Sequence, residues 1–166
     1  SEEIVSPSQT IENYEHWALM CNNVSKIDQT DTETEARFCE IKTTVSIKNE
    51  DGNAVPIINI NVGQLPNSED FLMLFQVPSD VFLRSTINLG LKDPSQESVE
   101  IIAEGTYFRC QQSGCLADTK LPEAIIDKLS SSNNAIAYFV DSNKRTIGIP
   151  VSLLGFKNSL IALQNK

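Results

Sequence analysis

The chain has few of the residues and motifs on which most enzyme active sites depend. Among its 166 residues there is a single histidine, His16, and no G-x-S-x-G, H-E-x-x-H, P-loop or G-x-G-x-x-G motif. No apolar run reaches about eighteen residues, so we expect no transmembrane helix. No signal peptide is present, and the chain begins at Ser1 with a polar leader, as a mature or truncated chain does. We therefore predict a protein that is not an enzyme and needs no cofactor.

Positive charge is scarce as well. Lys and Arg total 13 against 22 Asp and Glu residues, which gives a formal net charge of −9. A protein that binds nucleic acid or an anionic membrane through its charge needs the opposite sign. We therefore exclude non-specific nucleic-acid binding.

Four carboxylates lie close together between the first two cysteines. They are Asp28, Asp31, Glu33 and Glu35. The segment has neither the D-x-D-x-D-G pattern nor the turn glycine of an EF-hand calcium loop. We predict that residues 22–35 form a solvated loop that is held at its ends by a disulfide and binds no metal.

The four cysteines, Cys21, Cys39, Cys110 and Cys115, lack the C-x-x-C spacing of zinc sites and thioredoxin-type redox sites. They therefore indicate disulfides and an oxidising compartment. Three pairings are possible, and we predict the local one, Cys21–Cys39 with Cys110–Cys115. The chain-entropy treatment assigns roughly 3 kcal/mol to the first disulfide and about 2 kcal/mol to the second.

The length and an apolar content of 40% fit one globular domain. Branched and aromatic residues alternate in short stretches between turn residues, which predicts eight or so β-strands. The candidate strands are 16–21, 37–48, 55–62, 71–77, 81–91, 98–103, 106–110, 135–140 and 146–151. Residues 104–105 are predicted to turn a compact hairpin, and the disulfide is predicted to close the tip of a second hairpin at 110–115. We predict a mostly β fold, either an antiparallel β-sandwich or a partly open barrel.

Two short helices complete the predicted domain. Apolar residues at helical spacing from Leu121 to Leu129 predict the first helix. Ser152 is predicted to cap a second helix that carries an apolar stripe to Leu163. Trp17 lies four residues before a cysteine and is predicted to pack beside that disulfide in the core. Residues 1–12 are predicted to form a flexible arm before a single domain, 13–166.

Several motifs, taken together, resemble a known family. They are Trp17-x3-Cys21 with Cys39, Leu89-Gly90-Leu91, Phe108-Arg109-Cys110-x4-Cys115-Leu116-Ala117 and Val151-Ser152-Leu153-Leu154-Gly155-Phe156. Their order resembles the invasion-associated locus B (IalB) family of exported bacterial proteins, best over residues 84–163. The long acidic segment between Cys21 and Cys39 departs from the family pattern.

The resemblance implies an exported virulence protein, periplasmic or associated with the outer membrane or cell surface, that contributes to invasion of host cells, notably erythrocytes. It implies structural cysteines and brings no catalytic residue with it. We expect a non-enzymatic interaction module that binds an unidentified host-cell surface component through loops, in an oligomeric state left open. The candidate contact residues lie in the acidic segment and at the second hairpin tip: Asp28, Asp31, Glu33, Glu35, Gln112 and Ser113.

Two other functions remain as alternatives. The first is a periplasmic role in envelope maintenance or small-ligand binding, with an indirect effect on invasion. The second is a hydrolase that uses His16, the one histidine available to a Ser-His-Asp or Cys-His arrangement. We expect His16 instead to be a partly exposed residue at the edge of the sheet.

Overall fold

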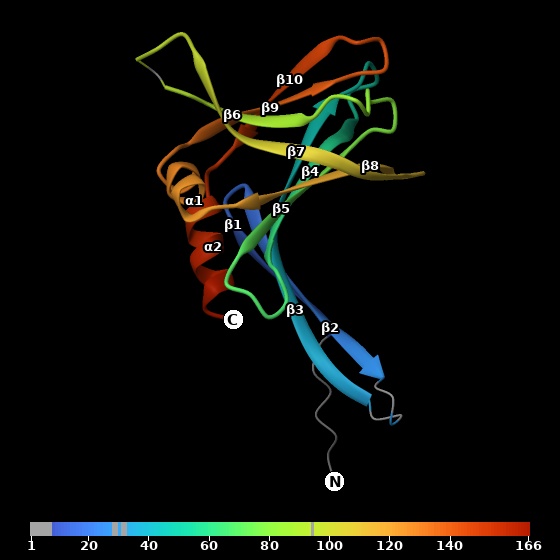
Figure 1. Ribbon diagram of the computed structural model, residues 1–166, viewed down its shortest axis with the longest axis vertical. Coiled ribbons are helices and arrows are strands. Elements are labelled where there is room, and N and C mark those ends of the chain that lie inside the picture. The colour runs from blue at the N-terminus through green and yellow to red at the C-terminus, as the bar shows by residue number, and fades with distance from the viewer. Residues whose placement is uncertain (1–7, 28–29, 31–32, 94) are drawn as a thin grey trace.

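The computed structural model describes residues 8–27, 30, 33–93 and 95–166, and for 24–27 and 33–35 it describes the backbone alone. In this part of the chain, ten strands form one antiparallel open sheet in the order β1-β2-β3-β4-β5-β8-β7-β6-β9-β10 (Figure 1). The strands are β1 (Gln9–Tyr14), β2 (Trp17–Ile27), β3 (Glu33–Lys48), β4 (Ala54–Gln64), β5 (Phe71–Val77), β6 (Ile87–Lys92), β7 (Val99–Gln111), β8 (Gly114–Leu121), β9 (Asn134–Val140) and β10 (Thr146–Ser152). The helices are α1 (Glu123–Ser130) and α2 (Phe156–Gln164). The predicted mostly β fold with two short helices is confirmed.

Strand β7 joins the two halves of the sheet. Its first half, residues 99–105, pairs with β6, and its second half, from Thr106 onward, pairs with β8. The predicted hairpin at 104–105 is therefore wrong, because the strand continues through Gly105. A Cβ on Gly105 would lie 2.9 Å from Ile87 and 3.0 Å from Phe75. Glycine is needed here because the two halves of the sheet approach closely, and not because the chain turns.

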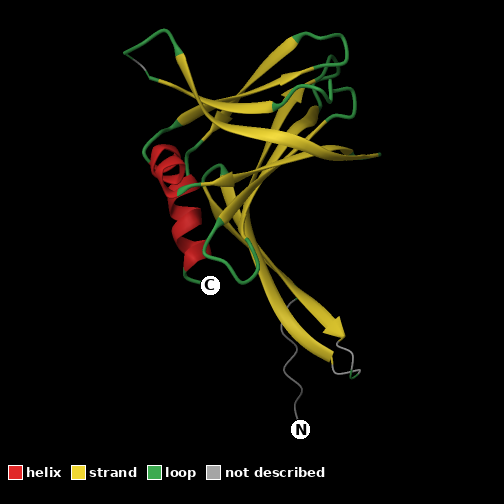
Figure 2. Cartoon of the chain, in the orientation of Figure 1, coloured by secondary structure: helices red, strands yellow, loops and turns green. Residues whose placement is uncertain are grey.

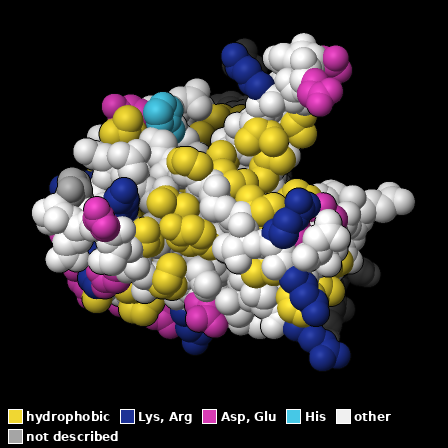
Figure 3. Space-filling model, turned by 90° about the horizontal axis from the view of Figure 1, so that it is seen from above, with side chains coloured by type: hydrophobic (Ala, Val, Ile, Leu, Met, Phe, Trp, Pro, Cys, Tyr) yellow, Lys and Arg dark blue, Asp and Glu magenta, His cyan; other side chains and the backbone are white. Residues whose placement is uncertain are grey.

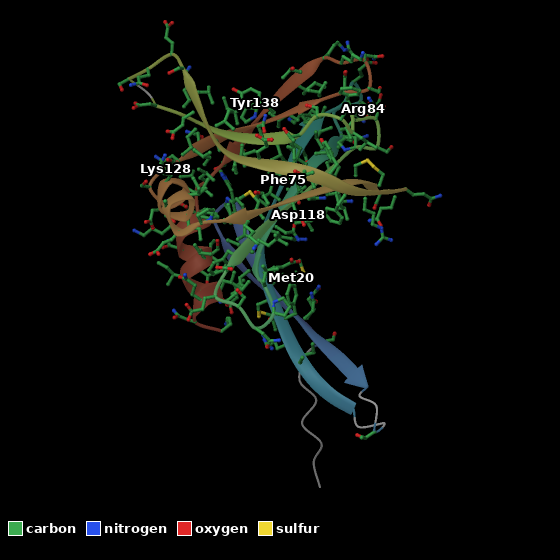
Figure 4. The ribbon with its side chains drawn as sticks, in the orientation of Figure 1. Met20, Phe75, Arg84, Asp118, Lys128 and Tyr138 are labelled. Carbon is green, nitrogen blue, oxygen red and sulfur yellow. A yellow bond between two sulfur atoms is a disulfide. The ribbon has the colours of Figure 1, made fainter. Side chains whose placement is uncertain are left out.

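The core lies against β5, which was predicted as a strand at 71–77. Phe71, Met73, Phe75 and Val77 alternate as buried residues along it, and β5 pairs with β4 on one side and β8 on the other. Figure 4 shows Phe75 at the centre of the molecule. Each large apolar side chain buried in this way contributes about 1.5–3 kcal/mol. The largest fully buried side chains are Trp17, Phe75, Phe156, Leu19, Ile41, Ile58, Ile60, Met73, Ile87, Leu89, Leu129 and Val62.

Apolar side chains also reach the surface at one end of the sheet. Figure 3, the view from above, shows apolar side chains gathered across the middle of this end, with charged groups around them. Ile47 and Val55 lie opposite each other on β3 and β4 and are both exposed. The core is therefore less completely covered here than it is beside the helices.

Hydrogen bonds join the β1–β2 turn and the start of β2 to the end of β10 and the residues that follow it. The indole N–H of Trp17 donates to the carbonyl of Ser152 at 2.9 Å, and the amide N–H of His16 donates to the carbonyl of Leu154 at 3.1 Å. The Trp17 ring packs edge-on against Phe156, with 5.1 Å between the ring centroids. The predicted core position of Trp17 is confirmed. Its contact with Phe156 links β2 to α2, the helix that follows β10.

The start of α2 differs from the prediction that Ser152 caps it. Ser152 is the last residue of β10, and Gly155 occupies the N-cap position with φ of 93°. The Ser152 hydroxyl instead accepts a hydrogen bond from the Leu154 amide at 3.2 Å. A serine before an apolar stripe is a typical capping signal, but here its side chain closes the turn that leads out of the strand.

Two predicted boundaries near the N-terminus also differ from the structure. Residues 9–12, assigned to a flexible arm, belong to β1 and pair with β2, while residues 1–7 lie outside the described residues. The predicted loop at 22–35 is largely a hairpin, because β2 runs to Ile27 and β3 begins at Glu33. The polar residues of these strands provide no apolar alternation, so the sequence pattern did not reveal them.

The β2–β3 hairpin extends beyond its neighbours as an arm. Pairing with β1 ends at Asn22, and pairing with β4 begins at Glu40. Beyond these points the two strands have no other strand partner among the described residues, although the Asn23 N–H still donates to the Ser8 carbonyl at 3.0 Å. Figure 2 shows the two strands projecting from the body. A two-stranded ribbon without further support is only marginally stable in water.

Candidate functional site

The tip of the β7–β8 hairpin is fixed covalently at its base. Cys110 and Cys115 face each other in the strand register and are joined by a disulfide, as predicted. Gly114, which comes directly before Cys115, has φ of 131°, and a Cβ there would overlap the carbonyl oxygen of Val77. Glycine therefore allows the hairpin to lie directly on the end of β5.

The two candidate contact residues at this tip, Gln112 and Ser113, are exposed. The side-chain amide of Gln76 donates to the Ser113 carbonyl at 3.0 Å, and that of Gln111 donates to the Ser113 hydroxyl at 3.1 Å. Gln112 and Ser113 also line a hollow of about 300 Å³ beside β4 and β5. The tip is thus an ordered, uncharged surface that offers hydrogen-bonding groups to a partner.

The second candidate contact region is the β2–β3 arm. Its base is joined by the Cys21–Cys39 disulfide, between residues that are directly opposite in the register. The backbone of Glu33 and Glu35 belongs to the outer half of the arm, opposite Ile27 and Ser25. Asp28 and Asp31 lie outside the described residues, as do the side chains of Glu33 and Glu35.

The two candidate regions do not come together. Figure 1 shows the arm and the β7–β8 tip pointing away from the body in different directions. Near the base of the arm, Arg37 donates to the Thr10 hydroxyl at 2.8 Å and Phe38 is 43% exposed. The exposure of Phe38 was not predicted, because a place in a strand next to a cysteine does not show which way the ring faces.

His16 takes part in the hydrogen bonds that join the β1–β2 turn to the end of β10. It is exposed, as predicted, and its Nδ1 lies 2.6 Å from the hydroxyl of Ser152. Its carbonyl accepts a hydrogen bond from the Thr43 hydroxyl at 2.8 Å. None of the ion pairs among the described residues includes His16. These contacts give His16 a place in holding the β1–β2 turn against the end of β10.

A buried carboxylate organises the turn between β9 and β10. Asp141 accepts hydrogen bonds from the backbone N–H groups of Asn143 and Arg145 and from the Arg145 guanidinium, at 3.0, 2.9 and 3.1 Å. The Arg145 backbone N–H, together with its guanidinium charge, lowers the pKa of Asp141 below its ordinary value. The predicted strands at 135–140 and 146–151 are confirmed and pair as a hairpin, and this carboxylate fixes its turn.

All four cysteines are in disulfides, with the predicted local pairing. Over the described ranges, no group of three His, Cys, Asp or Glu side chains is placed to hold a metal ion. Two structural disulfides are typical of a protein outside the cytoplasm.

The sequence profile described as Invasion associated locus B (IalB) protein matches residues 17–164, which include nine of the ten strands and both helices. The chain belongs to the IalB family. The predicted resemblance is therefore confirmed over almost the whole chain, while β1 lies before the matched range. No curated protein sequence matches this IalB-family chain.

A solved structure has the same fold. The crystal structure of invasion associated protein B from Bartonella henselae superposes with a TM-score of 0.66, over 95% of this chain and 99% of that chain. Its sequence is 16% identical, so the similarity concerns the fold. Within the described part of this IalB-family chain, neither helix is long and apolar enough to cross a membrane.

Proposed function

We propose that this IalB-family protein is exported, acts in the periplasm or at the bacterial cell surface, and contributes to invasion of host cells such as erythrocytes as a non-enzymatic interaction module. The observation that carries the proposal is the pair of hairpin ends, each anchored by a disulfide and projecting from one sheet. Recognition surfaces are commonly loops held by a rigid scaffold.

Anchoring at the base favours binding because it reduces the conformational entropy that a loop loses when it contacts a partner. The Gln112–Ser113 tip has this property, since two side-chain amides hold Ser113. The arm adds charge to the surface: its sequence places four carboxylates, and no cation, between residues 28 and 35. We expect the tip to contribute hydrogen bonds and the arm to attract a basic patch on the partner.

A binding assay on erythrocytes tests the proposal. Labelled wild-type protein is expected to bind the cells saturably, and the E33Q/E35Q double variant is expected to bind several-fold more weakly at low salt. E50Q/D51N is the matched control, because it removes the same charge from the turn at the other end of β3. Equal binding by all three proteins would show that the carboxylates of the arm do not contribute to binding. An absence of saturable binding by the wild-type protein would contradict the proposed function.

The second candidate function is a periplasmic role in envelope maintenance or small-ligand binding. The observation that favours it is a hollow of about 650 Å³ between the β6–β7 loop and the end of α1, lined mostly by polar side chains. Lys128 reaches across to Glu100 at 2.6 Å on its border. Protease treatment of intact bacteria separates direct contact with a host cell from this second function, since a protein exposed at the cell surface is degraded and one confined to the periplasm is protected.

A further inference from the structure

A groove of about 640 Å³ lies between α1, α2 and the loop that joins β4 to β5. Figure 1 shows this loop beside α2, with α1 above. Phe71, Leu121 and Leu160 are buried beneath the groove, and Ile126 is partly exposed. Ile161 is 46% exposed, although it lies directly beside this core. Ile126 and Ile161 therefore supply apolar surface, the floor of the groove, that the described residues leave uncovered, above a buried layer of apolar side chains.

The two helices each turn one continuous face toward the groove. The helical residues that line it are Glu123, Ile126, Asp127 and Ser130 on α1, and Lys157, Leu160, Ile161 and Gln164 on α2. On each helix these are positions i, i+3, i+4 and i+7, which form a single stripe. Two such stripes make an elongated groove, which suits a chain segment lying along it better than a compact small molecule.

The border of the groove is acidic. Glu69 and Asp70 come from the β4–β5 loop, Glu123 and Asp127 come from α1, and all four are exposed. None of them takes part in an ion pair among the described residues. Lys157 is the one cation in the lining, so the groove carries a formal charge of −3, from four carboxylates and one ammonium.

An apolar floor with an acidic border complements one class of partner. We propose that the groove binds a cationic amphipathic segment of another protein, with its apolar side chains on Ile126 and Ile161 and its Lys or Arg side chains facing the carboxylates. The net charge of −9 opposes docking of a second copy, and the acidic border opposes nucleic acid and anionic lipid. This inference deepens the proposed function, on which it rests, by naming the chemistry of a partner.

The electrostatic part of this binding is expected to depend on salt. Exposed carboxylates attract cations over roughly the Debye length, about 8–10 Å at physiological ionic strength, and more salt screens this attraction. The apolar contact on the floor is insensitive to salt by comparison. Affinity is thus expected to fall as salt rises and to reach a plateau set by the floor.

The experiment measures fluorescence anisotropy of a labelled amphipathic peptide of Lys and Leu, titrated with the full-length protein. A scrambled peptide of the same composition has no apolar face and serves as the peptide control. We expect the E69Q/D70N/E123Q/D127N variant to bind the peptide about tenfold more weakly than wild type at low salt, with most of the salt dependence lost. The protein control, E50Q/D51N, is expected to bind like wild type.

Ile161→Ser tests the floor, and it is expected to fold because its side chain is already half exposed. A several-fold weaker affinity at high salt supports the proposal. It is overturned if the groove variants bind as wild type does, if the scrambled peptide binds equally, or if the protein forms a dimer that I161S dissociates. Erythrocyte binding is a separate measurement. If the protein binds the peptide at the groove but does not bind the cells, the proposed function is wrong and the groove proposal stands.

Discussion

Gly155 lies directly against the carbonyl oxygen of Tyr14, with no room between them for a Cβ. Tyr14 ends β1, and Gly155 precedes α2 with a φ of 93°, a conformation that side chains other than glycine rarely adopt. The contact lies beside the hydrogen bonds that His16 and Trp17 make to the end of β10. One glycine thus permits the two ends of a ten-stranded sheet to meet.

Gly155→Ala is expected to lower the free energy of unfolding by about 2–4 kcal/mol, because the left-handed conformation and the backbone overlap both oppose a side chain. Urea unfolding followed by Trp17 fluorescence measures the change. Gly52→Ala is the matched control, since Gly52 has φ of 80° but nothing within 4 Å of its Cβ position. It should cost about 1–2 kcal/mol. If both variants lost the same free energy of unfolding, the contact with Tyr14 would have no effect on stability.

The C21S/C39S variant is expected to lose roughly 3 kcal/mol of stability and to expose the arm to proteolysis. Its disulfide joins β2 to β3 near the point where the arm leaves the sheet, and past Asn22 on β2 the described ribbon pairs with no third strand. Limited trypsin digestion followed by mass spectrometry measures cleavage in the arm. C110S/C115S should lose about 2 kcal/mol and leave the rate of cleavage in the arm unchanged. Protection of the arm in both variants would contradict this account.

Asp141→Asn is expected to destabilise the protein at neutral pH and to have little effect in acid. The pKa of Asp141 is lowered from 3.8 by the Arg145 backbone N–H and guanidinium, so its stabilising effect is present above 3.8 and is lost as the pH falls through the lowered value. Urea midpoints for wild type and variant should converge as the pH falls below about 4. Asp51→Asn, in an exposed turn, should show no such convergence. A constant difference at all pH values would refute the ionic contribution.

Tyr107→Phe is expected to raise stability by about 1 kcal/mol, because the Tyr107 hydroxyl is the one buried side-chain polar atom in the described part of the chain without a hydrogen-bond partner. Burial also raises the pKa of Tyr107 to about 12. Stability arising from that shift is present below pH 10 and is lost as the pH rises toward 12. A spectrophotometric titration should show the last tyrosine ionising in wild type and missing in the variant. A less stable Y107F protein would indicate a partner for the hydroxyl.

The sequence predicted those elements whose signal lies within a few residues. A short continuous apolar run identified β5, helical spacing identified α1, and the short Cys110–Cys115 interval identified a hairpin with a disulfide. Predictions from the sequence were wrong where one residue type can serve two structural purposes. Gly105 allows close packing within a continuous strand, and Ser152 closes a turn without capping a helix.

The sequence also selected part of the candidate functional surface. It identified the Gln112–Ser113 tip, because this site lies within one hairpin. It did not identify the groove, because the groove combines the β4–β5 loop with two helices that are far apart in the chain. The stripe on α2 was visible in the sequence, but its periodicity is the same whether Ile161 is buried or exposed.

By itself, the sequence determined the mostly β class, the disulfide pairing and the family, because local periodicity, cysteine spacing and short motifs are properties of neighbouring residues. Only the tertiary structure decided that β7 joins two halves of one sheet, that Trp17 packs against Phe156, and that α1 and α2 leave an acidic groove open. The physical reason is that these features depend on which distant segments pack together. That choice is made by the burial of the whole apolar surface at once, and no single stretch of sequence encodes it.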